Sequence, residues 1–420
     1  MEHKDYKRVI DDRWSFRNAN TKEYTHCYHS YPAMMIPQIA RALITEYRPS
    51  GRLKLIFDPY VGSGTTLVEA CIAGIKSIGT DLNPLARLLS RVKCTTYNER
   101  EIIDELSEIQ SRLLFFQESM VRDCSFEHIS NYSFWYSKDS LIKLSYLSQL
   151  IDEYSSSFNK DFFKVALSEV VREASYTRNG EFKRFRMKEE AISSFHPDVF
   201  GLFERKVQRN ICGLQLFNKV TGLCNDTHVY DFNTTEAIPS DIICDGDVDM
   251  VVTSPPYGDS RTTVSYGQFS RWANEWFRFE NAATLDNLLM GGKKTKTKNF
   301  DTISISEQLN EIGQRDEKRY WEVVSFLNDY STSIANIAKS VRKGGVVCYV
   351  VGDRRVKNVQ IPLDFFTAEM FEKHGFKHNI TIVREIPNKR MPSKSSPTNI
   401  AGNHVETMSN EFIVILNKVE

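Results

Sequence analysis

The order of apolar and polar runs near the start of the chain predicts alternating strands and helices. The apolar run at 53–59 ends in Asp-Pro and is typical of a buried strand, and 61–75 begins as a glycine-rich turn and continues with helical periodicity. A second strand is predicted at 77–82, and Pro84 stands where proline favours the first turn of a helix. This succession is typical of the start of a doubly wound parallel sheet.

The pattern changes to helical periodicity in the middle of the chain, and strands return after it. Helices are predicted at 101–120, 138–154, 160–174 and 198–219. Strands follow at 227–232 and 247–254, then a polar segment at 258–318 and a long helix at 319–343. The last elements are predicted as a strand at 344–353, a helix at 362–375, and strands at 377–386 and 410–418.

These elements give seven strands, which lie near residues 53, 77, 227, 248, 345, 377 and 411. No helical run separates the last two strands, so they are expected to be antiparallel. Five parallel strands with helices, followed by an antiparallel pair, are the layout of the class I methyltransferase fold, which is Rossmann-like and belongs to the α/β class. We expect a core of 1–94 and 226–420, a largely helical insertion at 95–225, and a mobile insertion at 258–318.

Composition places the chain among ordinary globular proteins. Hydrophobic residues make up 41% and charged residues 26% of the 420 residues. No apolar run approaches the roughly 18 residues that span a bilayer, and the charged N-terminus lacks the apolar core of a signal peptide. We therefore expect a cytoplasmic protein that has no membrane partner.

Charge and cysteine content narrow the kinds of site that the chain can carry. The formal net charge is +0, so contacts with nucleic acid would have to come from local basic patches. The eight cysteines include no Cys-x-x-Cys pair, which argues against a disulfide framework or a zinc site. The segment 25–29, Thr-His-Cys-Tyr-His, offers at most three closely spaced ligands, so no metal site is predicted.

Chemically suited residues follow the ends of four predicted strands. In open α/β sheets, ligands bind outside the carboxyl ends of the strands. The residues at these ends are Asp58, Pro59, Gly62, Ser63 and Gly64 after the first strand, Asp81 after the second, Asp231 after the third, and Ser254, Pro255, Pro256 and Tyr257 after the fourth. Their alignment on one edge of the sheet predicts a single ligand site.

The first three groups suit an adenosine-containing ligand with a negatively charged end. Glycines allow a ligand to approach the backbone, and the helix start at 64–66 favours a carboxylate or phosphate. Asp81 suits two ribose hydroxyls, and Asp231 is placed to accept from an adenine amino group. Both S-adenosylmethionine and a nucleotide fit this description, but the turn lacks the lysine of a phosphate-binding Walker loop.

The fourth group, Thr-Ser-Pro-Pro-Tyr at 253–257, suits an exocyclic amino group of a base. Such a group is a poor nucleophile because its lone pair is delocalised into the ring. The Ser254 hydroxyl and the Pro255 carbonyl can accept its hydrogen bonds, and consecutive prolines fix that carbonyl in advance. Tyr257 offers a face on which a flipped base can stack.

The segments FDPYVGSGTTLVEA, GTDLNPLA and VVTSPPYG resemble three motifs of the amino-methylating DNA methyltransferases. The resemblance implies S-adenosyl-L-methionine as cofactor, double-stranded DNA as substrate, base flipping, and a cognate restriction endonuclease as a candidate partner. The segment 31–44 resembles the helix that packs on the methionine end of the cofactor in that family. The motifs and this segment add Tyr31, Pro32, Thr65 and Asn83 to the predicted cofactor site, which also includes Phe232, the neighbour of Asp231.

Serine as the first residue of the Ser-Pro-Pro-Tyr motif resembles the N4-cytosine branch of the family, so we predict a site-specific cytosine-N4 methyltransferase. N6-adenine enzymes more often carry aspartate or asparagine at that position. Family members usually place the target-recognition domain elsewhere in the chain, so the helical insertion at 95–225 is only a candidate for that role. The segment 259–272 follows the catalytic turn and either borders the flipped base or forms a mobile lid.

Three basic stretches are candidates for contacts with DNA phosphates. They are 175–188, 291–298 and 384–399. The predicted DNA-binding residues in them are Arg178, Lys183, Arg184, Arg186, Lys293, Lys294, Lys389, Arg390 and Lys394. Lysine and arginine near phosphates supply an affinity that depends on salt.

Other functions stay open beside N4-cytosine methylation. They are methylation of adenine N6, methylation of RNA at guanine N2, and an inactive nucleic-acid-binding subunit. RNA enzymes with similar motifs usually carry an RNA-binding domain before the core, whereas only about 50 residues precede the first predicted strand here. Cytosine-C5 chemistry needs a cysteine nucleophile, typically after proline, and the chain contains no Pro-Cys pair.

Overall fold

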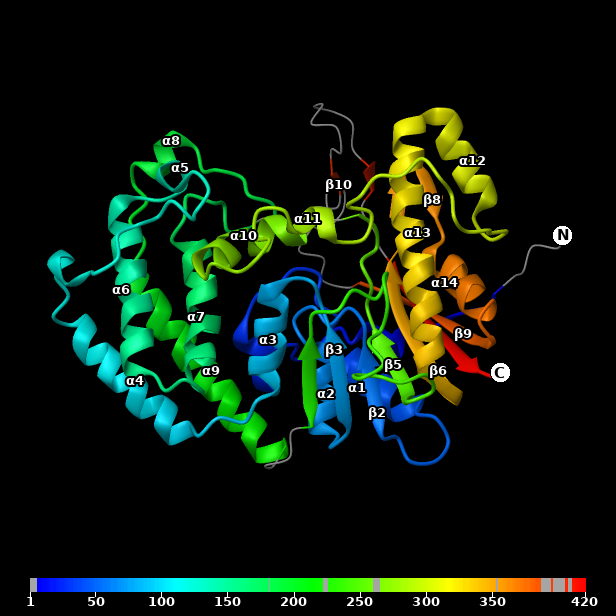
Figure 1. Cartoon of the computed structure of the whole chain (residues 1–420), viewed down its shortest axis with the longest axis horizontal. Coiled ribbons are helices and arrows are strands. Elements are labelled where there is room, and N and C mark those ends of the chain that lie inside the picture. The colour runs from blue at the N-terminus through cyan, green and yellow to red at the C-terminus, as the bar shows by residue number, and fades with distance from the viewer. Residues whose placement is uncertain are drawn as a thin grey trace.

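A twisted eight-stranded sheet covered by helices forms one half of the molecule, and a bundle of helices forms the other (Figure 1). The computed structural model describes residues 6–180, 182–221, 226–259, 265–352, 354–386, 394–395, 405–406 and 410–420. In this part of the chain, no helix is long and apolar enough to cross a membrane.

The strands of the sheet lie in the order β1-β9-β12-β6-β5-β2-β3-β4. They are β1 (Arg8–Ile10), β2 (Leu55–Asp58), β3 (Lys76–Thr80), β4 (Thr227–Tyr230), β5 (Val248–Thr253), β6 (Val341–Gly352), β9 (Phe376–Glu385) and β12 (Asn410–Lys418). Strands β4, β3, β2, β5 and β6 are mutually parallel, and β12 is antiparallel to both β6 and β9. The seven predicted strands, the antiparallel final pair and the class I methyltransferase fold are therefore confirmed.

Alternating side chains of the central strands build a separate core on each face of the sheet. Ile56 and Val252 pack against α1, whereas Phe57 and Val251 pack on the opposite side with α13 and α14. This two-residue period is what a strand buried on both faces requires. The helices beside the sheet are α1 (Pro37–Glu46), α2 (Thr65–Ile72), α3 (Pro84–Cys94), α13 (Glu317–Ser340) and α14 (Leu363–Glu372).

The eighth strand, β1, was not predicted because its three residues have no apolar pattern of their own. Ile10 is 78% exposed, so burial does not hold the strand in place. Instead β1 pairs in parallel with β9, and Arg8 forms an ion pair with the buried Asp364 at 2.8 Å. The strand depends on contacts with residues more than 350 positions away.

The helical bundle fills the interval between β3 and β4, where a helical insertion was predicted. It contains α4 (Glu99–Leu113), α5 (Tyr132–Trp135), α6 (Lys138–Tyr154), α7 (Lys160–Glu173), α8 (Glu189–Ile192) and α9 (Val199–Thr221). We call these six helices the helical block. Its apolar core also takes in Leu85 and Leu89 of α3, so the block packs directly on a helix of the sheet.

The polar segment after β5 contains three helices that the sequence pattern did not predict. They are α10 (Tyr266–Trp276), α11 (Leu285–Leu288) and α12 (Ser306–Arg315). Helix α10 buries Phe269, Trp272 and Trp276 in the core of the helical block. The mobility of this insertion stays a prediction, and residues 260–264 lie outside the described part of the chain.

Short elements complete the description. They are the 3-10 helices η1 (Asp12–Ser15), η2 (Tyr24–Tyr28) and η3 (Glu118–Met120), and the strand pairs β7 (Arg354–Val356) with β8 (Val359–Ile361) and β10 (Lys394–Ser395) with β11 (Val405–Glu406).

Candidate active site

A pocket that is partly open to solvent, with about 950 Å³ of empty space when the solvent at its mouth is included, lies at the carboxyl ends of β2, β3 and β5. Twelve of the sixteen residues predicted for the cofactor and catalytic sites line it. They are Tyr31, Pro32, Asp58, Pro59, Gly62, Ser63, Thr65, Asp81, Asn83, Phe232, Ser254 and Pro256. The other four, Gly64, Asp231, Pro255 and Tyr257, belong to the same strand ends but do not line the pocket.

The glycine turn between β2 and α2 is held close to two neighbouring elements. The Gly62 N–H donates to Asp81 Oδ2 at 3.0 Å, and the Gly62 carbonyl accepts from the Ser90 hydroxyl at 2.9 Å. Gly64 has a φ of +84°, and a Cβ there would lie 2.9 Å from the Cα of Ser90. Glycine is needed at position 64 both for this backbone conformation and for the close approach of α3.

Ser63, in the same turn, has a buried hydroxyl that faces the pocket region without a partner. The residue is 3% exposed, and its Oγ makes no hydrogen bond within the described part of the chain. A buried hydroxyl without a partner carries an energetic penalty. A polar group of a bound ligand would remove that penalty.

Asp58, at the end of β2, is a buried carboxylic acid. Its Oδ1 accepts from the Thr253 hydroxyl at 2.6 Å and from the Tyr60 N–H at 3.2 Å. Burial raises the pKa of Asp58 to about 6, although these two hydrogen bonds oppose the rise. Near neutral pH this group supplies a negative charge at the floor of the pocket.

Asp81, at the end of β3, uses each of its carboxylate oxygens once. Oδ2 accepts from the Gly62 N–H, and Oδ1 accepts from the Asn83 N–H at 2.8 Å. Burial raises the pKa of Asp81, and the two N–H groups partly oppose this effect. Since each carboxylate oxygen has a second lone pair, Asp81 can still accept from two hydroxyls of a ligand.

Asn83 lines the pocket, but its amide group is occupied within the protein. Nδ2 donates to the Tyr31 hydroxyl at 2.9 Å and to the Ser270 hydroxyl at 2.7 Å. Oδ1 accepts from the Leu85 N–H at 3.2 Å and from Asn274 Nδ2 at 3.1 Å. All four hydrogen-bonding positions of the amide are used. Asn83 therefore shapes the pocket. Its amide has no hydrogen-bonding position left for a ligand while these four bonds are made.

Asp231, predicted to accept from an adenine amino group, does not line the pocket. Its side chain is 77% exposed and lies 3.9 Å from Arg87. The next residue, Phe232, lines the pocket in its place. This strand end thus offers the pocket an aromatic ring rather than a carboxylate.

The Thr-Ser-Pro-Pro-Tyr turn contacts a residue that the sequence did not indicate. The Ser254 hydroxyl lies 3.2 Å from the Tyr257 hydroxyl, which donates to Glu411 Oε1 at 3.1 Å. Glu411 also forms an ion pair with Arg384. Ser254 and Pro256 line the pocket, whereas the Tyr257 hydroxyl is turned toward Glu411 in β12.

Tyr266, at the start of α10, is a pocket residue from the segment expected to border a flipped base or to act as a lid. Its ring stacks on Tyr31, with the centroids 6.1 Å apart and the planes at 25°. Leu289 and Met290, which follow α11, also line the pocket, and no sequence signal pointed to them. They come from an insertion whose pattern is polar, so only the folded chain brings them to the sheet edge.

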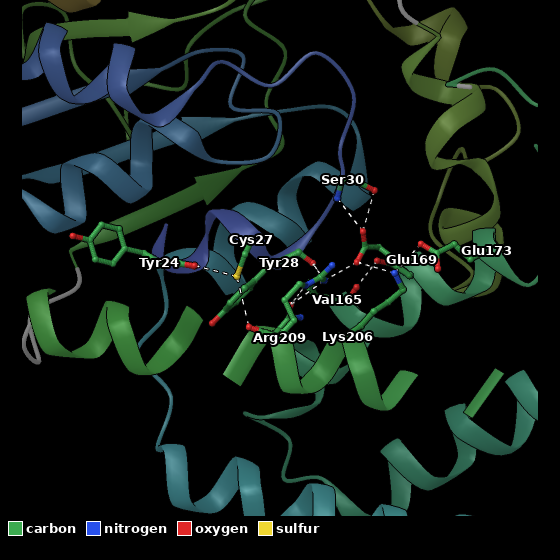
Figure 2. Close-up of polar contacts among 11 residues, drawn as sticks. Tyr24, Cys27, Tyr28, Ser30, Val165, Glu169, Glu173, Lys206 and Arg209 are labelled. Atoms are coloured by element: carbon green, nitrogen blue, oxygen red, sulfur yellow. Dashed lines mark hydrogen bonds and ion pairs between the residues drawn. The ribbon is translucent and has the colours of Figure 1, made fainter. Parts of the chain in front are cut away.

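A buried carboxylate joins the helical block to the segment that carries Tyr31 (Figure 2). Glu169 of α7 accepts from the N–H and the hydroxyl of Ser30, both at 3.0 Å. It also pairs with Arg209 at 2.6 Å and Lys206 at 3.4 Å, both on α9. Burial would raise the pKa of Glu169, but the neighbouring positive charges outweigh it and lower the pKa. The wall of the pocket is thereby anchored to the helical block.

The histidines of the 25–29 segment are part of the protein core. His26 Nε2 lies 2.9 Å from Glu69 Oε1, and Arg41 donates to the same carboxylate at 2.8 Å. His29 is 2% exposed. Within the described residues, no group of three histidine, cysteine, aspartate or glutamate side chains could hold a metal ion.

The predicted DNA-binding residues occupy several environments. Arg184 lies 4.6 Å from the centre of the Trp272 ring, and Arg186 donates to the Phe134 carbonyl at 3.0 Å and pairs with Glu189. These two arginines therefore pack against α5, α8 and α10. The remaining predicted residues divide by position: Arg178 and Lys183 lie between α7 and α8, Lys293 and Lys294 follow α11, Lys394 begins β10, and Lys389 and Arg390 lie outside the described residues.

Sequence comparisons relate the whole chain to proteins of known class. A family model described as DNA methylase matches residues 1–88. The type II methyltransferase M.MvaI of Kocuria varians is 37% identical over 435 aligned residues, which cover 98% of this chain and 95% of that protein.

The chain belongs to the type II DNA methyltransferase family.

A more distant relative in the family is the type II methyltransferase M.BsoBI of Geobacillus stearothermophilus. It is 21% identical, with 89% of this chain and 84% of that protein covered. Among solved structures, the rRNA methyltransferase AviRa of Streptomyces viridochromogenes is 9% identical over 93% of this chain and 89% of that chain, with a TM-score of 0.34. A likeness this low says nothing about the substrate of the methyltransferase described here.

Type II DNA methyltransferases take their methyl group from S-adenosyl-L-methionine, and the pocket fits that molecule. The unpartnered Ser63 hydroxyl suits a carboxylate, and the second lone pairs of Asp81 suit a pair of ribose hydroxyls. Phe232 and Leu82 supply apolar surface for a purine ring. The prediction of S-adenosyl-L-methionine as cofactor is therefore confirmed at the level of the family.

Proposed function

We propose that this type II DNA methyltransferase methylates the exocyclic N4 amino group of a cytosine at a specific site in double-stranded DNA. One observation carries the proposal: Ser254 and Pro256 line the same pocket as Asp58, Ser63 and Asp81. A turn suited to an amino group and a set of residues suited to the cofactor thus share one cavity. Such sharing is what a direct transfer between the two molecules requires.

The cofactor roles that we propose follow from the free hydrogen-bonding positions. S-adenosyl-L-methionine supplies an electrophilic methyl group when it is bound. Asp81 would hold the ribose, the turn at Ser63–Thr65 would hold the carboxylate, and Asp58 would face the ammonium group. Phe232 would contact the adenine, and Tyr31 with Pro32 would cover the methionine end.

The catalytic turn would act by accepting hydrogen bonds from the base. The lone pair of a cytosine amino group is delocalised into the ring, and acceptors at its hydrogens help the nitrogen to pyramidalise toward the methyl group. We assign these acceptors to the Ser254 hydroxyl, which lines the pocket, and to the Pro255 carbonyl, which lies between the lining residues Ser254 and Pro256 and is held rigid by Pro256. Because the pocket is recessed, the base must leave the duplex stack to reach them.

Basic residues in two segments support an approach of DNA over the mouth of the pocket. On the side of the helical block, the rings of Phe182 and Phe269 are 6.3 Å apart, and Phe269 is 5.9 Å from Tyr31. Lys183 is the next residue in the chain after Phe182. In the segment after α11, Lys293 follows the pocket residue Met290 by three positions. We propose that both lysines contact phosphates and that the helical block reads the target sequence.

Methylated DNA identifies the product directly. The purified protein is incubated with genomic DNA and methyl-labelled S-adenosyl-L-methionine, and the DNA is digested to nucleosides for mass spectrometry. We expect labelled N4-methylcytosine, and Ser254→Ala should lower kcat by about 10²–10³-fold, as loss of a direct hydrogen bond to the reacting group does. Binding of S-adenosyl-L-methionine should stay unchanged in that variant.

A serine elsewhere provides the control. Ser111→Ala removes an exposed hydroxyl on α4 whose only partner among the described residues is the Ser107 carbonyl, so its activity should equal that of the wild type. Labelled N6-methyladenine would replace the cytosine assignment with the adenine one. Label in tRNA but not in DNA would point to guanine N2, and no label with either substrate would point to an inactive nucleic-acid-binding subunit.

The names of the relatives support a place in a restriction–modification system. M.MvaI and M.BsoBI are type II methyltransferases, and we propose that this chain likewise works in the cytoplasm beside a cognate restriction endonuclease. Sequencing of methylated positions in DNA from cells that express the chain would give the target. A plasmid from those cells should then resist an endonuclease that cleaves that target.

A further inference from the structure

Glu411 lies beside the catalytic turn although it is more than 150 residues away in sequence. It is the second residue of β12, which runs antiparallel to β6, and it pairs across the sheet with Gly352 at the end of β6. The start of an antiparallel strand meets the same edge as the ends of its parallel neighbours. The edge that carries the ligand site therefore includes the start of β12.

The contacts of Glu411 form one chain of polar groups. Arg384 of β9, which is the cross-strand partner of Glu411, forms an ion pair with Glu411 Oε2. The Tyr257 hydroxyl donates to Glu411 Oε1 at 3.1 Å, and the Ser254 hydroxyl lies 3.2 Å from the Tyr257 hydroxyl. The side chains of Arg384 and Glu411 are 5% and 17% exposed, so water competes little for these bonds.

The carboxylate fixes the direction of every hydrogen bond in this chain. An ionised carboxylate only accepts, so the single hydroxyl proton of Tyr257 must point to Glu411. The Tyr257 oxygen then accepts the proton of Ser254. Both lone pairs of the Ser254 oxygen are left for a group in the pocket, which is the arrangement that an incoming amino group needs.

We propose that Glu411 is a positioning residue that keeps Ser254 oriented as a hydrogen-bond acceptor for the substrate amino group. The inference deepens the proposed function and rests on it. Without the carboxylate, Tyr257 can donate to Ser254, and Ser254 can turn its own proton toward the pocket. A donor would then face a donor, and the amino group would lose its acceptor. By fixing the Tyr257 hydroxyl, Glu411 also sets the plane of the ring.

A double-mutant cycle tests this role. We expect Glu411→Gln to lower kcat by about 10–100-fold, less than loss of a direct partner of the reacting group costs. Tyr257→Phe, which keeps the ring and removes the hydroxyl, should lower kcat to a similar extent. In the double variant the two losses should not add, because Glu411 acts through the Tyr257 hydroxyl. The KM for DNA and the Kd for S-adenosyl-L-methionine should change by less than about twofold.

Glu385→Gln is the matched control. Glu385 follows Arg384 in β9, and its exposed side chain pairs with Arg17 at 2.9 Å. Its kcat should equal that of the wild type. Additive losses in the double variant, or an unchanged kcat in Glu411→Gln, would refute the role of Glu411. If Glu411→Gln fails to fold, Tyr257→Phe decides alone: it leaves the Arg384–Glu411 pair intact, and an unchanged kcat in it would refute the proposal.

A spectroscopic readout separates this inference from the proposed function. The Cζ resonance of ¹³C-labelled Tyr257, assigned by its absence in Tyr257→Phe, should shift in Glu411→Gln and stay in place in Glu385→Gln. No shift in Glu411→Gln would contradict the hydrogen bond whatever the enzyme methylates. Conversely, methylation of adenine instead of cytosine would overturn the base assignment and leave the role of Glu411 to be judged on the kcat ratios.

Discussion

Asp58 has an ionisation that opposes folding, which makes its contribution to stability depend on pH. Burial raises its pKa from 3.8 to about 6, so the folded state binds the proton more tightly than the unfolded chain does. For an acid with a raised pKa, stability is greatest below the unfolded value and falls as pH rises to the folded value. A difference of one in pKa between the folded and unfolded states corresponds to about 1.4 kcal/mol. The rise from 3.8 to about 6 therefore means that ionisation of Asp58 lowers the stability of the fold by about 3 kcal/mol above pH 6.

We predict that Asp58→Asn removes this cost in the cofactor-free protein. Between pH 4 and 6, the free energy of unfolding of the wild type should carry a falling contribution from Asp58, and the variant should lack it. Above pH 6 the variant should be at least as stable as the wild type, because an amide oxygen can still accept from Thr253 and Tyr60. Its affinity for S-adenosyl-L-methionine should fall if the carboxylate faces the ammonium group. Urea denaturation at several pH values and calorimetry would measure the two effects.

Asp249 supplies a control of opposite sign. Its Oδ2 accepts from the N–H groups of Lys54 and Leu55 at 2.7 and 2.9 Å, and it pairs with Arg342. Burial would raise its pKa, but these partners outweigh it and lower the pKa below 3.8. Asp249→Asn should therefore destabilise the protein at neutral pH. Parallel behaviour of the two aspartate variants would contradict the assignment of Asp58.

At the scale of elements, the pocket is built where two helices, α3 and α10, meet around one side chain. Asn83 caps α3, and its amide also bonds Ser270 and Asn274 of α10. Helix α10 in turn packs Trp272 into the helical block. The pocket wall, α3 and the block are thus coupled through a buried amide, which is 1% exposed.

We predict that Asn83→Ala is far more costly than the loss of an ordinary helix cap. It would leave the side chains of Ser270 and Asn274 and the Leu85 N–H without their partner, and each unpaired buried group costs about 1–3 kcal/mol. The total loss should be about 3–5 kcal/mol in the free energy of unfolding, measured by urea denaturation. The affinity for S-adenosyl-L-methionine should fall as well, because Tyr31 loses its anchor.

Asn98 provides the matched comparison, since it is also an asparagine cap. It caps α4, is exposed, and within the part of the chain that the structure describes its side chain bonds only Arg100 and Glu101. Asn98→Ala should cost about 1 kcal/mol and leave cofactor affinity unchanged. Equal losses in the two variants would show that Asn83 is a cap and nothing more.

The sequence predicted those elements whose position follows from the apolar and polar pattern of their own residues. The central strands alternate between two buried faces, and α6 and α9 have long apolar periodicity, so their positions could be predicted closely. Helix α10 could not, because Phe269, Trp272 and Trp276 are buried by residues far away in sequence, among them Tyr31 and side chains of the helical block. Strand β1 likewise depends on Arg8 and its distant partner Asp364.

Part of the site could be predicted from the rule that ligands bind at the carboxyl ends of parallel strands. That rule brought the glycine turn, Asp81 and Ser254 to one edge, and these residues share the pocket. It could not show which way a side chain points, so Asp231 was expected to face the ligand and instead is exposed. It also considers only the ends of parallel strands, and therefore missed Glu411 at the start of an antiparallel one.

At the scale of the whole molecule, the formal net charge of +0 means that electrostatic attraction to DNA has to come from local basic patches. The chain has 54 lysines and arginines against 54 aspartates and glutamates. Many of the basic residues are already paired, as Lys294 is with Glu322 at 2.8 Å. Attraction to DNA must therefore come from a few side chains near the pocket mouth.

We predict that Lys183→Ala and Lys293→Ala each weaken DNA binding in a salt-dependent manner. The slope of log Kd against log salt concentration should become shallower by about 0.9 for each phosphate contact that is lost. Fluorescence anisotropy with a labelled duplex at several salt concentrations would measure the slope. Lys219→Ala is the control, because Lys219 is exposed in the last turn of α9, which leads to the start of β4 at the opposite edge of the sheet. If Lys293→Ala kept the wild-type slope while Lys183→Ala did not, the duplex would lie along the helical block alone, and the loop after α11 would serve only to close the pocket.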